Sequence, residues 1–181
     1  MKHFMALAAL CSLAGCVAAI PVVAPPPIVL APEQRTLAAE IAARPDLSIF
    51  AAQLAASGDA GLAAAPPMTV FATLDDAYAR LAPGVVPAML TVENRPLLTK
   101  VVAYHIVPGA LDPVELRRRV AAGNGRATLV TLAGDPLVVT LTGTTLTLTD
   151  VDGDVGYVGE DVRRPNGILY PVNGFLAPAV E

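Results

Sequence analysis

The spacing of apolar residues changes near Ala127, and the change restricts the folds that the chain can adopt. Between Glu33 and Gly123 apolar residues recur mostly at helical spacing, whereas from Ala127 onward short runs of Thr, Val and Leu alternate. These runs, ATLVTL, PLVVTL and TLTLT, are separated by turn-forming AGD and TGT segments. Helices in the N-terminal half followed by mainly antiparallel strands predict an α+β fold rather than alternating βαβ units.

Cap and breaker residues set the bounds of the predicted elements. The break at 44–45 ends a first helix, Gly58 is suited to cap the second, and Asp75 or Asp76 can begin the third. The DPVE segment that starts at Asp112 has the N-cap, proline and acidic residue of a helix start. The sequence predicts helices over residues 33–43, 46–57, 75–82, 93–103 and 113–122, and strands over 69–72, 104–109, 127–132, 136–141, 145–149 and 167–172, with a further turn and strand within 151–162.

The composition fits an exported domain that does not bind nucleic acid. The chain has 181 residues, of which 54% are hydrophobic and 15% are charged, and its net charge is -4. The charged share lies well below the usual value of about a quarter, so Thr, Gly, Pro and Ala must cover much of the surface. An acidic chain lacks the basic surface that nucleic acid requires.

The first residues predict export and a lipid anchor. MKHFMALAALCSLAGC has a basic start, an apolar segment and small residues before Cys16, and it is too short to span a bilayer of about 30 Å. Its last four residues match the bacterial lipobox, so residues 1–15 are expected to be removed and Cys16 to be lipidated. Its acyl chains would anchor the protein to a membrane, facing the periplasm or the cell surface. The alternative is an ordinary secretory signal, cut for example after Ala19, with Cys16 discarded.

A proline-rich segment separates this anchor from the predicted domain. Residues 16–34 contain the lipidated cysteine and a run without periodic pattern, which either forms an extended tether or packs partly on the domain. Residues 35–181 form the predicted domain. Because Cys11 lies in the signal peptide and Cys16 would be acylated, the domain must be stable without disulfides.

Three segments resemble, in the right order, the sequence blocks of the fasciclin (FAS1, beta-Ig-H3) domain family. TVFATLDDAYARL at 69–81 resembles the first block, AYHIVPG at 103–109 the Tyr-His block, and NGILYPVNGFLAP at 166–178 the second block. The resemblance covers about residues 45–180. It implies a FAS1-like wedge of two β-sheets with helices packed alongside, and a role in cell adhesion and association with extracellular matrix.

The chain also departs from the pattern of this family. Thr73-Leu74 replace the usual Pro-Thr, Tyr170 stands where a histidine is common, and Asn173 stands where an aspartate is common. In some animal members, an aspartate near the second block and the Tyr-His block are implicated in integrin contact. Because Asn173 replaces the aspartate and bacteria lack integrins, that role is not expected here. The resemblance leaves as candidate binding residues, in or beside the blocks, Tyr104, His105, Pro108, Asp75, Asn166 and Asn173.

His105 is the only histidine outside the predicted signal peptide. A lone histidine in a domain without cysteine cannot complete a zinc site, and no GxSxG motif accompanies it. Strand alternation would place His105 and Val107 on one face, with Tyr104 and Ile106 on the other, in a strand that is apolar on both faces. The favoured interpretation is a core histidine held by backbone or hydroxyl partners, and surface recognition is the alternative.

Other polar segments also have a structural and a functional interpretation. DVDGD at 150–154 could bind calcium weakly. An EF-hand loop needs a glycine at its sixth position and flanking helices, and this segment has neither, so a hairpin turn is favoured. The arginines at 117–119 are expected to be solvated, with lipid headgroups or acidic polysaccharide as alternative contacts that 163–164 could join. The Asn-Gly pairs at 166–167 and 173–174 favour tight turns over recognition loops.

These observations predict a non-enzymatic, lipid-anchored envelope protein without cofactor or metal. It would mediate adhesion or associate with envelope proteins or polysaccharides through exposed loops and a sheet edge. The alternative is a periplasmic carrier of a small hydrophobic ligand, such as a lipid or pigment, which would require a cavity of several hundred Å³. An enzyme centred on His105 is the least favoured hypothesis.

Overall fold

The structure is a computed structural model in which residues 34–58, 62 and 66–179 are described. The predicted signal peptide, Cys16 and the proline-rich segment up to residue 33 lie outside these residues. No helix in the described ranges is both long enough and apolar enough to cross a membrane.

Helices dominate the first half of the described chain and strands the second, as the sequence predicts. The elements are α1 (Leu37–Ala43), the 3-10 helix η2 (Pro45–Leu47), α2 (Ser48–Ser57), β1 (Met68–Thr73), α3 (Asp75–Tyr78), α4 (Val85–Met89), α5 (Arg95–Tyr104), β2 (Ile106–Pro108), α6 (Pro113–Ala122), β3 (Arg126–Val130), β4 (Pro136–Thr142), β5 (Thr145–Thr149), β6 (Val155–Tyr157), β7 (Val162–Arg164) and β8 (Gly167–Val172).

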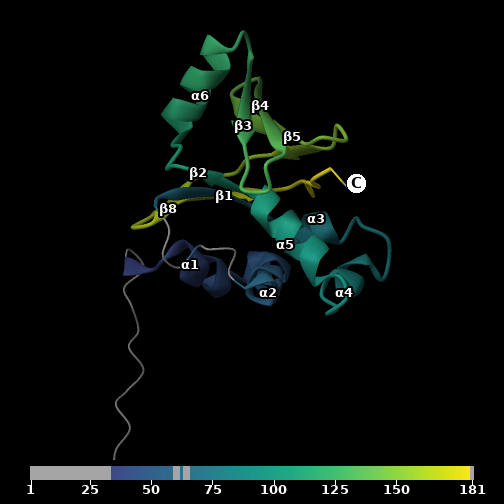
Figure 1. Cartoon of the computed structure of the whole chain (residues 1–181). Helices are drawn as coiled ribbons and strands as arrows, with labels where there is room; N and C mark the ends of the chain where they lie inside the picture. Colours follow the sequence, from purple (N-terminus) through teal and green to yellow (C-terminus); the bar gives the residue numbers. More distant parts are fainter. Residues whose placement is uncertain (1–33, 59–61, 63–65, 180–181) are drawn as a thin grey trace, which may run out of the picture.

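Two β-sheets form the frame of the domain (Figure 1). Sheet B has the strand order β3-β4-β5-β6, and its neighbours follow one another along the chain in antiparallel pairs. Sheet A has the order β2-β1-β8-β7. In sheet A, β1 pairs antiparallel with β2 and parallel with β8, so the last strand returns to the first.

Sheet A lies in the middle of the molecule and is covered on both faces. In Figure 1, α1 to α5 lie on one side of it, and α6 and sheet B lie on the other. One hydrophobic cluster, which includes Phe71 and Ile168, fills the space toward sheet B, and a second, which includes Phe50 and Leu169, fills the space toward the helices. All residues of β1 and β8 are therefore buried, whereas β3 alternates between exposed and buried positions.

Several predicted caps are present. Gly58 ends α2 in the left-handed conformation with φ of 82°, which a glycine adopts without steric cost. The Asp112 carboxylate accepts a hydrogen bond from the Glu115 N–H at 2.8 Å, and α6 follows with Pro113 in its first turn. These side chains fix the ends of α2 and α6 where the sequence places them.

The structure differs from the prediction around Tyr104. Helix α5 continues through Tyr104, and His105 is its C-cap, so the strand begins only at Ile106. The expected alternation is therefore wrong for the first two residues: Tyr104 joins the same cluster as Val107, and Ile106 joins the other. Tyr104 and His105 therefore form the end of α5, where their side chains continue the helical repeat.

Three further elements were not expected. Helix α4, the 3-10 helix η2 and strand β7 are each only three to five residues long, too short for a periodic pattern to reveal. The strand at 167–172 leaves the antiparallel cluster and pairs parallel with β1. Helix α3 also lacks the predicted side-chain cap: its N-cap is Leu74, and Asp75 and Asp76 lie in its first turn.

Candidate functional site

The three segments that resemble family blocks come together on sheet A. Residues 69–81 supply β1, residues 103–109 supply β2, and residues 166–178 supply β8. Strand β1 lies between the other two and pairs with both (Figure 1). Segments far apart in the sequence are therefore neighbours in sheet A, and the candidate residues lie on or beside these strands.

The imidazole of His105 is fully buried, and both of its nitrogen atoms are hydrogen-bonded. Nδ1 donates to the carbonyl oxygen of Val101 at 2.8 Å, which leaves Nε2 as the acceptor for the Thr73 hydroxyl at 3.0 Å. The Phe50 ring lies against the imidazole, with ring centroids 5.3 Å apart. Burial lowers the pKa of His105 to about 4, so the ring is neutral at neutral pH. The predicted burial of His105 in the core is confirmed.

Tyr104 and Tyr170 are buried rings whose hydroxyl groups bond to backbone. The Tyr104 hydroxyl donates to the carbonyl oxygen of Pro136 at 2.9 Å, and the Tyr170 hydroxyl donates to that of Leu111 at 2.9 Å. Tyr170 also stacks on Phe71, with ring centroids 5.4 Å apart. Burial raises the pKa of both phenols, which therefore stay protonated and act as donors. These rings connect elements within the core.

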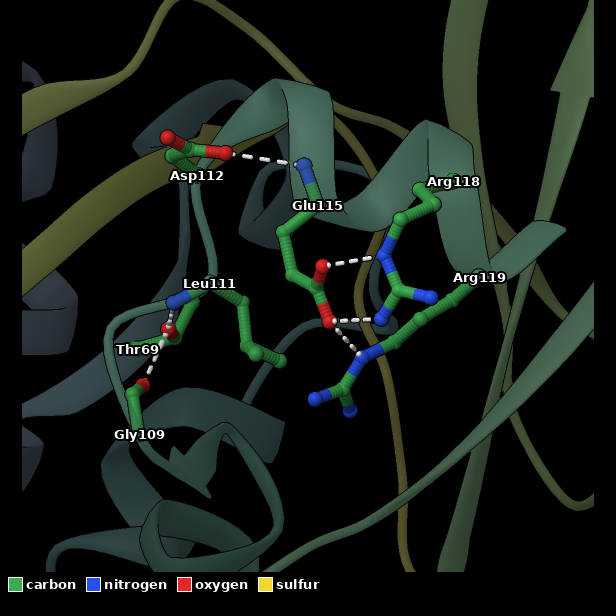
Figure 2. Close-up of polar contacts among 7 residues, drawn as sticks. All are labelled: Thr69, Gly109, Leu111, Asp112, Glu115, Arg118 and Arg119. Carbon is green, nitrogen blue, oxygen red and sulfur yellow. Dashed lines mark hydrogen bonds and ion pairs between the residues drawn. The ribbon is translucent and has the colours of Figure 1, made fainter.

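Pro108 is exposed at the end of β2, next to a turn that Thr69 holds in place. The buried Thr69 hydroxyl donates to the carbonyl oxygen of Gly109 at 2.7 Å and accepts from the Leu111 N–H at 2.8 Å (Figure 2). The Gly109 N–H donates to the carbonyl oxygen of Pro67 at 2.8 Å. The turn is therefore fixed, and Pro108 is the member of the Tyr-His block that faces solvent.

Asp75 caps a helix that lies elsewhere in the sequence. Its carboxylate accepts hydrogen bonds from the Ser48 N–H at 3.2 Å, the Ser48 hydroxyl at 2.6 Å and the Ile49 N–H at 3.0 Å. These groups belong to the first turn of α2, whose own N-cap residue provides no side-chain bond. The expected cap on α3 was wrong because tertiary packing gives this carboxylate a stronger set of donors.

Asn166 and Asn173 also bond to backbone groups of other elements. The Asn166 side chain accepts from the Leu37 N–H at 2.8 Å, at the start of α1, and donates to the carbonyl oxygen of Leu62 at 2.9 Å. The Asn173 side chain accepts from the Tyr157 N–H at 2.9 Å. Both asparagines therefore join segments. A binding role for the six candidate residues stays a prediction, and among them Pro108 and Asn173 are exposed.

Two of the three arginines of α6, Arg118 and Arg119, pair with one carboxylate, whereas Arg117 donates to the carbonyl oxygen of Thr144 at 3.5 Å. Glu115 binds Arg118 at 2.7 and 2.8 Å and Arg119 at 2.6 Å (Figure 2). Hydrogen bonds from these guanidinium groups lower the pKa of Glu115 to about 2. Arg163 lies beside Asp112 at 3.6 Å, and Arg164 pairs with Glu40 at 2.8 Å. The predicted solvated surface is confirmed for all three arginines at 117–119, which are exposed.

The DVDGD segment forms a turn around the buried carboxylate of Asp150. One oxygen accepts from the N–H groups of Asp152 at 3.0 Å and Asp154 at 2.8 Å, and the other accepts from the Ala177 N–H at 2.9 Å. The predicted turn is confirmed, and its carboxylate also holds the C-terminal segment. Within the described part of the chain, no three His, Cys, Asp or Glu side chains are grouped as metal ligands would be.

Tyr157 was missed at the sequence level. Its ring is 46% exposed, whereas Tyr78, Tyr104 and Tyr170 are at most 2% exposed. Its position in the short VGYVG run offers one hint, since alternation from the buried Gly156 and Val158 points its side chain outward. It is the one exposed aromatic side chain among the residues that the structure describes.

Tyr157 lines one hollow, and two further hollows each share lining residues with it. The Tyr157 hollow has a volume of about 260 Å³ and is lined by residues that include Arg44, Asp46, Tyr157 and Asn173. It shares Val158 and Gly159 with the α6 hollow of about 410 Å³, which is lined by residues that include Arg117, Thr144, Glu160 and Asp161. It shares Asp46 and Leu74 with the Asp76 hollow of about 350 Å³, whose lining also includes Asp75 and Asp76.

A separate hollow between α4 and α5 is mainly apolar. It has a volume of about 250 Å³, and its lining includes Val85, Met89, Leu97 and Val101. Leu97 is 41% exposed at its edge. A small apolar ligand would find apolar walls in this hollow.

Comparison with known proteins supports the resemblance seen in the sequence. The family model of the fasciclin domain matches residues 45–178. Two proteins of Synechocystis sp. are similar: protein sll1483 is 30% identical over 136 residues, covering 72% of this chain and 66% of that protein. The uncharacterized protein sll1735 is 30% identical over 98 residues, covering 51% of this chain and 67% of that protein. The chain thus spans about two thirds of the length of these curated relatives.

A solved structure shows the same fold. It is the FAS1 domain pair from the insect cell adhesion molecule fasciclin I, with a TM-score of 0.52 and 18% identity, covering 71% of this chain and 43% of that chain. Fasciclin domains are non-enzymatic and are generally associated with adhesion or protein interaction. Since the family model matches most of the described residues, this chain belongs to the fasciclin domain family.

Proposed function

We propose that this chain is a non-enzymatic, lipid-anchored fasciclin-domain protein of a bacterial envelope that mediates adhesion or association with surface proteins or polysaccharide. The match of the fasciclin domain model over residues 45–178 carries the proposal. The LAGC motif that ends at Cys16 supports the anchor, because a lipidated cysteine at that point would hold the domain at a membrane.

The structure supports a binding role rather than a catalytic one. His105 is enclosed and neutral, with both nitrogen atoms already bonded to Val101 and Thr73. A general base must lie within reach of a substrate proton, and the imidazole has no route to one in this arrangement. The exposed features of the described surface are hollows and loops, which suit recognition.

Membrane anchoring is tested by changing the cysteine. In the native host, Cys16→Ser is expected to move the protein from the membrane fraction to the soluble exported fraction, because the thiol that receives the lipid is lost. Cys11→Ser is the matched control, since that thiol lies inside the predicted signal peptide, and it should leave the protein in the membrane fraction. Unchanged fractionation of Cys16→Ser would contradict the anchor.

The adhesion or association role is tested with the lipidated protein in its own envelope. Pull-down from native membranes, followed by identification of bound proteins and glycans, is expected to yield a surface polymer or envelope protein. A mock preparation from the Cys16→Ser strain measures background capture. Recovery of nothing above that background would count against association.

A second candidate is a carrier of a small hydrophobic ligand, and the apolar hollow between α4 and α5 is the observation that favours it. The volume of that hollow, about 250 Å³, lies below the range of about 300–1,000 Å³ that is usual for small-molecule sites. A lipid or pigment would project into solvent there. Native mass spectrometry of protein from its own host would support the carrier if a ligand co-purified.

A further inference from the structure

We propose that the three adjoining hollows around Tyr157 form one groove that binds a linear polysaccharide without acid groups. The inference rests on the proposed association role and names the surface and the ligand class for it. The groove is the set of the Asp76 hollow, the Tyr157 hollow and the α6 hollow, which share lining residues at each junction.

The arrangement of the hollows favours an elongated ligand. Each has a volume between about 260 and 410 Å³, and each alone could hold only a small part of a large ligand. The Tyr157 hollow lies between the other two, since it shares Asp46 with one and Gly159 with the other. A polymer could contact all three in succession, with weak contacts that add along its length.

The side chains of the central hollow suit sugar rings. A sugar presents an apolar C–H face and a rim of hydroxyl groups, and a tyrosine offers an apolar ring with a polar end. Tyr157 is the exposed ring in the described structure, and it lies in this hollow. Beside it, Arg44 is held by Asp46 through two hydrogen bonds of 3.0 and 2.5 Å, so a planar polar pair is fixed at the wall.

The backbone along the groove argues against a peptide strand as the ligand. The Tyr157 N–H bonds to the side chain of Asn173, and the Tyr157 carbonyl oxygen accepts from the Asn173 N–H at 3.2 Å. The Val158 N–H donates to Leu146 at 3.0 Å, and the Gly159 N–H donates to Pro171 at 2.8 Å. An added strand needs unpaired backbone groups, and the N–H groups of residues 157–159 are already bonded.

The unpaired charges of the groove are mainly acidic. Its lining contains the carboxylates of Asp46, Asp75, Asp76, Glu160 and Asp161 and the guanidinium groups of Arg44 and Arg117. Asp46 pairs with Arg44, and Asp161 pairs with Arg163 at 3.1 Å. Asp76 and Glu160 form no hydrogen bond or ion pair with other residues of the described structure. A neutral or amine-bearing chain can therefore donate hydrogen bonds to them, whereas an acidic chain would be repelled.

The test is titration of the full chain, purified in detergent, by isothermal calorimetry with three hexasaccharides. Cellohexaose is the neutral probe, hexaglucosamine the amine-bearing probe and hexagalacturonate the acidic probe. The first two are expected to bind, and the acidic probe is not. Tyr157→Ala is expected to weaken binding of cellohexaose by about tenfold, and Tyr157→Phe to retain it, because the ring face is kept.

Charge-matched variants separate the groove from the rest of the surface. Glu160→Gln should weaken hexaglucosamine severalfold, whereas Glu93→Gln, at an exposed position outside the hollows, should leave it unchanged. If Tyr157→Ala does not fold, hydrogen exchange of residues 157–161 in the native protein, with and without cellohexaose, decides the location.

Several results would overturn the groove. These are the absence of binding for both non-acidic probes, equal binding of hexagalacturonate, unchanged binding by Tyr157→Ala, or protection elsewhere than 157–161. Capture of an envelope protein on this surface instead would also overturn it. None of these results would alter the fractionation of Cys16→Ser, so the groove and the anchored function can fail separately.

Discussion

Single residues within the three blocks bond to backbone groups of other segments. The Thr69 hydroxyl bonds to two backbone groups of the turn after β2, and the Tyr104 hydroxyl donates to a carbonyl group at the start of β4. A buried N–H or C=O without a partner costs about 1–3 kcal/mol, so each such contact favours one arrangement of the chain over its competitors. The blocks are therefore, in large part, the parts that specify the fold.

His105 should make the domain less stable in mild acid. Its folded pKa is about 4, below the value of about 6.5 for a free imidazole, so the unfolded chain binds a proton first as the pH falls. The contribution of the neutral ring is complete above pH 6.5 and is lost between pH 6.5 and 4, by up to roughly 1.4 kcal/mol per pH unit. Urea unfolding at a series of pH values would measure the slope.

A variant separates this titration from that of the carboxylates. His105→Gln retains a donor for Val101 and an acceptor for Thr73 but does not titrate, so its free energy of unfolding should fall less steeply across the same interval. The comparison concerns slopes, because the variant is also expected to be less stable at every pH. Equal slopes for both proteins would contradict a neutral, buried His105.

Elements that lie apart in the sequence are joined by polar side chains. Helix α1 is held at its start by Asn166, and Glu40 in its middle pairs with Arg164 of β7 at 2.8 Å. Both partners of this ion pair are mostly buried. Removing Glu40 would leave the charge of Arg164 uncompensated, which typically costs about 3–5 kcal/mol, whereas removing Arg164 would leave Glu40 with the longer contact to Arg35 at 3.8 Å. The helix that precedes the main match to the family is thus fastened to sheet A.

The cap that Asp75 places on α2 has a matched control in the next residue. Asp75→Ala is expected to lower the free energy of unfolding by about 1–2 kcal/mol, because two N–H groups and a hydroxyl of α2 lose their acceptor. Asp76→Ala should change it by no more than about 0.5 kcal/mol, since that side chain is exposed. Chemical denaturation of both variants measures the difference, and equal effects would show that Asp75 does not cap α2.

Elements could be predicted from the sequence where the pattern is local. Gly58 and the Asp112 cap mark real helix ends, and the Thr-rich runs are the strands of sheet B, because caps and alternation act within a few residues. The helical state of Tyr104 and the role of Asp75 could not be predicted. Both features depend on contacts with residues far along the sequence, and a local pattern carries no information about such contacts.

The candidate site shows the same limit. The likeness to family blocks predicts that residues 69–81, 103–109 and 166–178 matter, and they do meet on sheet A. The hollows around Tyr157 combine residues of the segment before α2, of α6 and of the turns of sheet B. No sequence motif predicts that combination. Exposure of one aromatic ring is a property of the folded surface.

For the whole molecule, the position of sheet A implies that the domain unfolds as one unit. β8 contributes neighbouring side chains to the two hydrophobic clusters: Ile168 points toward sheet B and Leu169 toward the helices. Loss of β8 would remove side chains from both clusters at once, and β8 pairs with β1 along six residues. Sheet A therefore couples the helical layer to sheet B.

Ile168→Ala and Leu169→Ala test this coupling from opposite faces of one strand. Each is expected to lower the free energy of unfolding by about 2–5 kcal/mol, because a buried aliphatic side chain leaves a cavity. In either variant, hydrogen exchange of α2 and of β4 during urea unfolding should shift to the same new midpoint. If Ile168→Ala lowered the midpoint of β4 alone, or Leu169→Ala that of α2 alone, the two layers would be separate folding units, and sheet A would only connect them.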